Sequence, residues 1–378
     1  MNSRKENGTM KRTHGFFTSQ PAAALVAAWV LAALCTPCAR AQSETRGEAV
    51  AEQAYKNIQV LKGVPASQIR TMMGLMNASL GVRCDACHVP NQMEKDDKEN
   101  KKTARKMIQM VLDTNEQAFN GHTEITCYTC HRGQVVPVTT PVIGSGLTPP
   151  PPPPPAAKAG EGLPGIDQIL QKYQAAAGDP GAFGKLKSRV MKGMVTDARG
   201  ESHPVEVLQA SPDKMATLVR MPKGTMGSGY NGKTGWNKNQ RGLTELVGLE
   251  LLLMRRNADF GRALNLGEEL QNPRVTGRTR VGDRPAYAVS ARTEGQRVQL
   301  CFDAETGQLL RRTVMIGTPI GALPQQTDYE NYKEVDGVRL PMVVRFTGPD
   351  PNSATTTVYQ EVTHNVSLDE ARFSAPQN

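Results

Sequence analysis

Two stretches, Cys84-Asp85-Ala86-Cys87-His88 and Cys127-Tyr128-Thr129-Cys130-His131, share the pattern C-x-x-C-H and decide how the first part of this chain folds. C-x-x-C-H is the attachment pattern of c-type haem. Two thiols three residues apart lie on the same side of one helical turn, so each can form a thioether with one vinyl group of a single porphyrin. The histidine that follows then faces the iron as its proximal ligand. The two stretches therefore predict two covalently bound haem c groups, with His88 and His131 as iron ligands.

Two other uses of paired cysteines fit the sequence less well. Zinc ribbons space their C-x-x-C units by about 15–20 residues. Here Cys87 and Cys127 are 40 positions apart, and four zinc thiolates would leave both motif histidines unexplained. A thioredoxin-type dithiol would need a βαβ context, which the flanking residues do not show. Zinc binding and thiol redox chemistry remain the alternatives to haem.

Residues 1–41 have the pattern of a secretory signal peptide. Basic residues precede a 13-residue apolar run, Ala22–Leu34, and the small-residue site Ala39-Arg40-Ala41 follows it. The run is short for a membrane span, but an uncleaved anchor stays open, as does lipid modification at Cys35. Export agrees with the motifs, because c-type haem is attached outside the cytoplasm. We expect a periplasmic protein.

The net charge narrows the class of partner, and the remaining cysteine has a structural interpretation. The signal carries five basic residues and one acidic residue, so the formal net charge of +9 falls to about +5 after cleavage. A mild basic excess suits an acidic redox partner or an anionic membrane surface. No Lys/Arg run is interleaved with aromatic residues, so we expect no nucleic-acid partner. Outside the haem motifs the mature chain keeps only Cys301, in the strand-like run Val298–Phe302, and we expect a buried structural thiol.

A proline run predicts the domain boundary. Seven consecutive prolines, Pro149–Pro155, would extend about 22 Å as a stiff polyproline spacer. Residues 141–162 are therefore expected to link a haem domain over residues 42–140 to a second domain over residues 163–378.

The first domain is expected to be all-α. Apolar residues recur at helical spacing over Ala66–Leu80, and Gly81 is a plausible C-cap. A second amphipathic helix is expected over Thr103–Asn115. The charged stretch Glu94–Lys102 before it is expected to be a solvated loop or a helix start.

The second domain is expected to be α+β, with one helix over Gly165–Ala177, an antiparallel β meander, and an apolar helix over about Leu243–Met254. Short alternating runs predict the strands, and Asn-Gly, Gly-Asp, Thr-Gly and Asp-Gly pairs predict the turns. Representative strands are Arg189–Val195, Val205–Leu208, Ala216–Met221, Ala286–Ser290, Leu309–Val314 and Thr355–Tyr359.

The second axial ligand of each iron is expected to be a methionine on the helix that leads into its motif. Met73 lies 11 residues before Cys84, and Met107 lies 20 residues before Cys127. Core packing is the ordinary role of a methionine on an apolar helix face, but the repeated arrangement favours ligation here. The near alternatives are Met72, Met76, Met110 and His122.

The segments Ala104–Val111, Cys127–Gly133 and Leu80–His88 resemble the cytochrome c subunit of photosynthetic reaction centres over about residues 55–138. That resemblance implies a repeated unit of helix, turn and C-x-x-C-H, with a helix methionine as the usual axial ligand, a position that Met107 matches. The photosynthetic subunit typically carries four haems, and a histidine after its second helix serves a fourth. His122 occupies a similar place, yet this chain has no fourth motif, so a photosynthetic role is not implied.

The second domain resembles the half-barrel of outer-membrane lipoprotein carriers through Gly229–Trp236, Phe302–Leu310 and Tyr332–Pro341. That resemblance implies a curved antiparallel sheet around a helix, and a lipid or acyl chain as ligand. The same Asp-Gly and Thr-Gly pairs also occur in ordinary hairpins.

The leading interpretation is an exported dihaem cytochrome that carries single electrons between periplasmic or membrane partners. The alternative is a lipid- or lipoprotein-binding module whose haem domain serves as sensor or tether. A haem enzyme would need an open sixth site and a distal acid or base, and the sequence shows a methionine candidate for each haem and no such signature. We therefore do not expect an enzyme.

Overall fold

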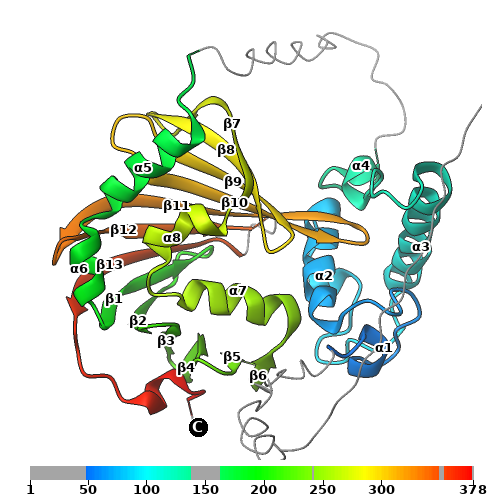
Figure 1. Ribbon diagram of the computed structural model, residues 1–378. Coiled ribbons are helices and arrows are strands. Elements are labelled where there is room, and N and C mark those ends of the chain that lie inside the picture. The colour runs from blue at the N-terminus through cyan, green and yellow to red at the C-terminus, as the bar shows by residue number, and fades with distance from the viewer. Residues whose placement is uncertain (1–47, 138–161, 241, 349–352, 377–378) are drawn as a thin grey trace, which may run out of the picture. The chain divides into compact units, whose positions relative to one another are not determined.

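The computed structural model describes residues 48–137, 162–240, 242–348 and 353–376 (Figure 1). The predicted signal peptide, Cys35 and the proline run lie outside the described residues. Within the described residues, no helix is both long enough and apolar enough to cross a bilayer.

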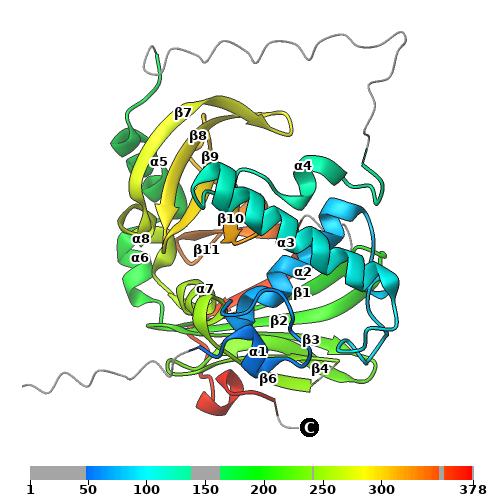
Figure 2. The same ribbon diagram turned by 90° about the vertical axis from the view of Figure 1, so that its right-hand side faces the viewer.

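Residues 48–137 contain several helices joined by turns and loops. The elements are α1 (Ala51–Ala54), α2 (Ala66–Leu80), the 3₁₀ turn η1 (Cys84–Ala86), α3 (Glu99–Phe119) and α4 (Cys127–His131). Figures 1 and 2 show α2 and α3 as the two long helices, with the short α4 close to one end of α2.

Helix α2 has the predicted bounds, and a glycine is required at its end. Gly81 caps the helix with φ at 64°, a left-handed conformation that glycine adopts without strain. A side chain at position 81 would also collide with the carbonyl oxygen of Gly133, just after the second motif. The Gly133 amide donates to the Ser79 carbonyl at 2.8 Å. The end of α2 is therefore joined to the second haem motif as well as leading into the first.

Helix α3 is longer than the predicted Thr103–Asn115 segment, because part of the charged stretch before it is helical. Lys101 in its first turn is buried, whereas a solvated side chain is expected from sequence. Farther along, Ile108, Val111 and Asn115 form the buried face at intervals of three and four residues. Asn115 is the one amide on that face.

The C-terminal part is a single antiparallel sheet with helices on its concave side. Its helical elements are α5 (Ile166–Ala177), α6 (Pro180–Lys185), α7 (Gly248–Ala258), α8 (Arg262–Glu269) and the 3₁₀ turn η3 (Glu370–Phe373). Its strands are β1 (Ser188–Asp197), β2 (Ser202–Ala210), β3 (Lys214–Met221), β4 (Gly224–Tyr230), β5 (Gly235–Asn239), β6 (Gly242–Leu246), β7 (Gln271–Val281), β8 (Arg284–Thr293), β9 (Gln296–Asp303), β10 (Leu309–Thr318), β11 (Gly321–Val335), β12 (Val338–Thr347) and β13 (Thr355–His364).

The strand order confirms the predicted open antiparallel β domain. The 13 strands are ordered β6-β5-β4-β3-β2-β1-β13-β12-β11-β10-β9-β8-β7. Strands that follow one another in sequence pair as a meander, and β1 pairs with β13 in the middle. The sheet curves around α5, α7 and α8 (Figures 1 and 2). The turn pair Asp336-Gly337 has φ of 50° and 80°, as a tight hairpin requires.

The helix predicted over Leu243–Met254 begins later than expected. Residues Gly242–Leu246 form the edge strand β6, which pairs with β5, and α7 starts only at Gly248. The apolar residues of this segment do not separate the two states, because a short apolar run suits a strand as well as a helix. The predicted helix Gly165–Ala177 is confirmed as α5.

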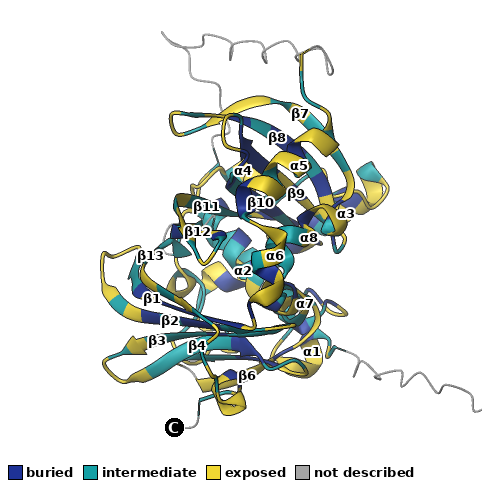
Figure 3. Cartoon of the chain, turned by 60° about the vertical axis from the view of Figure 1, so that its left-hand side comes forward, coloured by how far each residue is buried: buried dark blue, intermediate teal, exposed yellow. Residues whose placement is uncertain are grey.

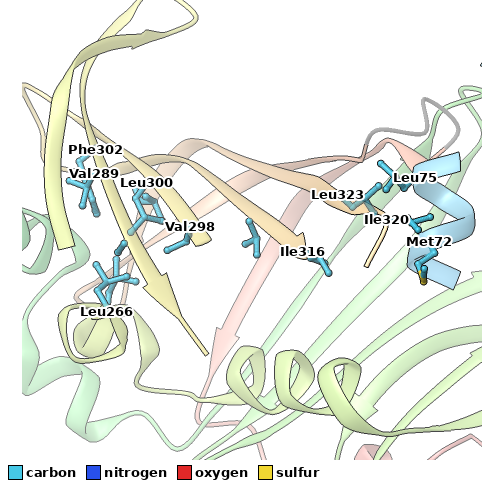
Figure 4. Packing of buried hydrophobic residues seen from close by; sticks show 14 of the residues in the cluster. Met72, Leu75, Leu266, Val289, Val298, Leu300, Phe302, Ile316, Ile320 and Leu323 are labelled. Carbon is cyan, nitrogen blue, oxygen red and sulfur yellow. The ribbon is translucent and has the colours of Figure 1, made fainter. Parts of the chain in front are cut away.

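The main core lies between α5, α8 and strands β8 to β10. Phe302 and Tyr173 meet edge to face, with ring centroids 5.4 Å apart. The buried positions on β9 and β10 appear in dark blue in Figure 3. Met72 and Leu75 of α2 belong to the same cluster, and Figure 4 shows them beside Leu323 at its other end.

Cys301 is buried on β9, as expected of a structural thiol. It packs with Ala286 and Leu310 in a small separate cluster, and burial raises the pKa of its thiol.

Candidate haem sites

Each C-x-x-C-H stretch forms a single helical turn. In the first, the amides of Cys87 and His88 both donate to the Cys84 carbonyl, at 3.2 and 2.9 Å. In the second, Cys127–His131 is a short α-helix. A helical turn places residues three apart on the same side, which the formation of two thioethers to one porphyrin requires.

The two motif histidines are oriented in the same way. His88 Nδ1 lies 3.0 Å from the Met93 carbonyl oxygen, and His131 Nδ1 lies 3.0 Å from the Gln134 carbonyl oxygen. A carbonyl oxygen only accepts, so in each pair Nδ1 is the protonated donor. In the neutral tautomer that this contact selects, Nε2 is the nitrogen without a proton and can bind a metal. Metal-binding histidines are commonly oriented by such a hydrogen bond from the other ring nitrogen.

A cavity of about 450 Å³ adjoins the first motif. Cys84, Cys87 and His88 of the motif line it, together with Met73 and Met76 of α2. Both thiols, the imidazole and a thioether sulfur therefore share one cavity, and this donor set fits a haem c group with His/Met ligation. Met72, one of the alternatives, is fully buried in the core cluster and does not line the cavity.

A cation holds the loop that follows the first motif. Lys101 Nζ donates to the carbonyls of Met93 and Lys95 at 2.8 and 2.7 Å, and pairs with Asp96 at 3.0 Å. The Met93 carbonyl thus accepts from both Lys101 and His88. Arg105 also pairs with Asp96, at 2.9 Å. Hydrogen bonds from Arg105, Asn57 and Lys101 hold the pKa of Asp96 well below its usual value, so this carboxylate stays ionised.

A buried amide holds the segment that leads into the second motif. Asn115 is 4% exposed. Its Nδ2 donates to the Ile125 carbonyl at 2.7 Å, and its Oδ1 accepts from the amides of Glu124 and Ile125 at 3.1 and 2.9 Å. Thr126 then caps α4 through a reciprocal hydrogen-bonded pair with Thr129. Together these contacts fix the position of the backbone immediately before Cys127.

The candidate ligands for the second haem lie at the surface of α3. Met107 is 43% exposed and Met110 is 49% exposed, three residues apart on one side of the helix. His122 is exposed in the turn after α3. The protein geometry thus leaves Met107, Met110 and His122 all accessible, and the sequence-based choice of Met107 stays a prediction.

The motif thiols do not form a compact metal-binding cluster. Burial raises the pKa of Cys87 and of Cys127, so both are protonated thiols at neutral pH. Among the described residues, no group of three or more His, Cys, Asp or Glu side chains could hold a metal ion.

Comparison with known proteins agrees with this geometry. Residues 18–146 match the family model of the photosynthetic reaction centre cytochrome C subunit. The subunit from Thermochromatium tepidum is 38% identical over 91 residues, which are 23% of this chain and 22% of the relative. The subunit from Roseobacter denitrificans is 34% identical over 102 residues, 24% of this chain and 27% of the relative. Cytochrome c-554 of Chloroflexus aurantiacus is 35% identical over 82 residues, 20% of each chain.

The resemblance to reaction-centre cytochromes is thereby confirmed for the N-terminal part. The chain spans only about a quarter of the length of these relatives. The likeness concerns the haem-bearing segment and not the whole protein.

Solved structures resemble the C-terminal part at low identity. A LolA superfamily protein from Nitrosomonas europaea has a TM-score of 0.39 and 12% identity, over 56% of this chain and 99% of that chain. A putative outer membrane lipoprotein-sorting protein domain from Vibrio parahaemolyticus has a TM-score of 0.38 and 10% identity. The match covers 55% of this chain and 94% of that chain. Both matches are too distant to support a conclusion about the family or the ligand of this part of the chain.

Sequence reasoning missed the residues that orient the motifs. Lys101 and Asp96 lie in a charged stretch that looks solvated, and no local pattern indicates burial. Asn115 does carry a signal, because it continues the apolar series of Ile108 and Val111 on α3. A polar residue in such a series predicts a buried side chain with specific hydrogen-bond partners.

Proposed function

We propose that this protein is an exported dihaem c-type cytochrome that carries single electrons between partner proteins. The observation that carries the proposal is the shared geometry of the two C-x-x-C-H turns. The histidine that ends each turn donates from Nδ1 to a main-chain carbonyl, so that Nε2 is free for iron. The cavity that joins Cys84, Cys87 and His88 to Met73 supports the same conclusion for the first site.

The residues have separate roles in this proposal. The four motif thiols attach the two porphyrins, and His88 and His131 bind the irons. Met73 and Met107 complete the ligand sets, which raises the reduction potentials relative to other ligand sets. Each bound haem would supply reversible one-electron chemistry. With a histidine and a methionine on each iron, a substrate would have no open site there, so we propose a carrier and not an enzyme.

The organisation and location are part of the proposal. We propose that residues 1–41 direct export to the periplasm and that residues 141–162 join the haem domain to the β domain. The similarity of the N-terminal part to reaction-centre cytochrome subunits supports electron transfer as the role. The donor and acceptor would be other proteins, reached at the surface or at a membrane.

The number of haems is the first test. Mass spectrometry of the exported protein should show two haem additions, one on a peptide with Cys84 and Cys87 and one on a peptide with Cys127 and Cys130. The reduced protein should show the α band of c-type haem. A single addition, or zinc in place of iron, would contradict the proposal.

The second haem should depend on Met107. Met107→Ala should turn one of the two haems high spin and lower its potential, because a thioether ligand that favours ferrous iron is lost. Met110→Ala is the matched control on the same exposed side of α3, and we expect stability within about 0.5 kcal/mol of the parent and an unchanged spectrum. The measurement is the absorption spectrum with a redox titration. If the two variants exchange phenotypes, Met110 is the ligand, and if neither changes the spectrum, His122→Ala is the next variant to measure.

A further inference from the structure

A second cavity, of about 250 Å³, lies in the β domain and contains none of the haem-motif residues. Its lining residues come from helices α5, α6, α7 and α8 and from strands β1, β2, β10, β11 and β12. Its walls include the buried rings of Phe183 and Phe260 and the side chain of Leu340. It differs from an ordinary gap in a core because arginines line it.

The guanidinium of Arg189, on β1, is held by two hydrogen bonds and a ring contact, and one of its nitrogens has no partner. The residue is 7% exposed. Its Nε donates to His364 Nε2 and its Nη1 donates to Gln209 Oε1, both at 3.1 Å. The guanidinium lies 5.1 Å from the centre of the Phe260 ring. Its Nη2 is buried and has no hydrogen-bond partner.

The contact with His364 fixes the orientation of Arg189 without neutralising it. His364 Nδ1 pairs with Asp336 Oδ2 at 2.8 Å. Burial lowers the pKa of His364, so a neutral imidazole donates from Nδ1 to Asp336 and accepts from Arg189 at Nε2. Within the described residues, Arg189 has no ion pair with a carboxylate. A buried cation in this state is costly unless an anion joins it.

Arg312 of β10 is a second unpaired cation in the same cavity. It is 9% exposed, and its guanidinium makes no hydrogen bond or ion pair with any residue that the structure describes. Burial lowers the pKa of Arg312 to about 9, and that of Arg189 to about 10, so both remain charged at neutral pH.

The acidic groups near this cavity are already engaged. Glu269 pairs with Arg262 at 2.9 Å, and Glu294 pairs with Arg256 at 3.2 Å. Asp259 accepts from the amide of Gly261 at 2.9 Å. The protein therefore places two buried guanidiniums in one cavity, and no described carboxylate forms an ion pair with either, although the charge of Glu269 still acts on Arg312.

We propose that this cavity binds a small organic carboxylate, whose carboxylate group accepts from the free Nη2 of Arg189 and whose apolar body lies against Phe183, Phe260 and Leu340. Arg312 adds a second positive charge to the same cavity. Guanidinium groups suit carboxylates because their N–H donors match the two oxygens. The cavity is smaller than the roughly 300–1,000 Å³ of sites for drug-sized ligands, so the body is short. The three tyrosines Tyr173, Tyr329 and Tyr332 add aromatic lining, which favours an aryl group.

The test uses the haem-loaded full chain and 2-naphthoate as the probe, with 2-naphthamide as its uncharged counterpart. Isothermal titration should show saturable binding of naphthoate at one site and at least tenfold weaker binding of the amide. Arg312→Met should weaken naphthoate binding at least tenfold. Arg297→Met, which removes an exposed arginine of β9 outside the cavity, should leave it unchanged.

Thermal unfolding without ligand gives a second, independent readout. Arg312→Met should raise the melting temperature of the ligand-free protein, because it replaces an unpaired buried charge by an apolar side chain of similar length. An arginine that only stabilised the fold would give a lower melting temperature. The proposal is overturned if the parent protein binds no naphthoate at millimolar concentration, if inorganic phosphate binds while naphthoate does not, or if Arg312→Met leaves binding intact or lowers the melting temperature.

Discussion

Met73→Ala should convert the first haem from low to high spin and lower its reduction potential, while the second haem keeps its spectrum. Met73 lines the same cavity as Cys84, Cys87 and His88, and its thioether would supply a soft ligand to an iron bound there. Axial ligands set haem potentials over a range of about 0.8 V, so the change should be large compared with any effect of packing alone. Absorption spectra and a redox titration of the purified variant measure both effects.

Two neighbouring methionines on α2 make the test specific. Met72 is buried in the core cluster away from the cavity, so Met72→Ala should cost about 2–5 kcal/mol of unfolding free energy and leave the spectrum unchanged. Met76 and Met93 also line the cavity, and Met76 is the alternative on the same helix as Met73. A high-spin spectrum for Met76→Ala together with a normal spectrum for Met73→Ala would assign the ligand to Met76.

Asn115→Ala should give the largest loss of stability in the haem domain. The substitution removes one donor and one acceptor and leaves the carbonyl and the amide of Ile125 without partners, whereas the Glu124 amide keeps the His122 carbonyl as acceptor. Each unsatisfied buried group costs about 1–3 kcal/mol, so the total should reach several kcal/mol. The same change frees the segment before Cys127, so the fraction of second motifs that carry haem should also fall. Denaturant unfolding and peptide mass spectrometry measure the two effects.

Gln109→Ala is the control for this variant. Gln109 lies on the exposed side of α3 and bonds only to Asp113, at 2.8 Å, among the described residues. Its replacement should change stability by no more than about 0.5 kcal/mol. Asn115→Asp keeps the acceptor for the two amides and loses the donor to Ile125, so its stability should fall between those of the parent and Asn115→Ala. Equal stability of Asn115→Ala and Gln109→Ala would show that the amide does not hold this segment.

Sequence periodicity predicted the elements that depend on local pattern. The bounds of α2 followed from apolar residues at helical spacing and from Gly81, whose φ of 64° suits glycine. Helix α5 and the meander followed from periodicity and from turn pairs such as Asp336-Gly337. The α7 region was less predictable, because the run from Leu243 has no period that separates an edge strand from a buried helix.

The contacts that set the candidate sites depend on residues far apart in the chain. Nothing local to Arg189 indicates that His364, 175 positions later, will accept its hydrogen bond. Nothing near Arg312 indicates that no carboxylate will face it. The participation of Met72 in the β-domain core is equally non-local, and it distinguishes Met72 from Met73, which spacing alone could not do.

The hydrogen bonds that orient His88 and His131 share a property with consequences for how these sites tolerate mutation. Both acceptors are main-chain carbonyls, of Met93 and Gln134. Every amino acid supplies that oxygen, so exchanging either side chain leaves the acceptor in place. Insertions or deletions that redirect the backbone after each motif would move it. We therefore expect the residues between each histidine and its acceptor to vary in identity. The number of positions from histidine to carbonyl, five after His88 and three after His131, should stay constant.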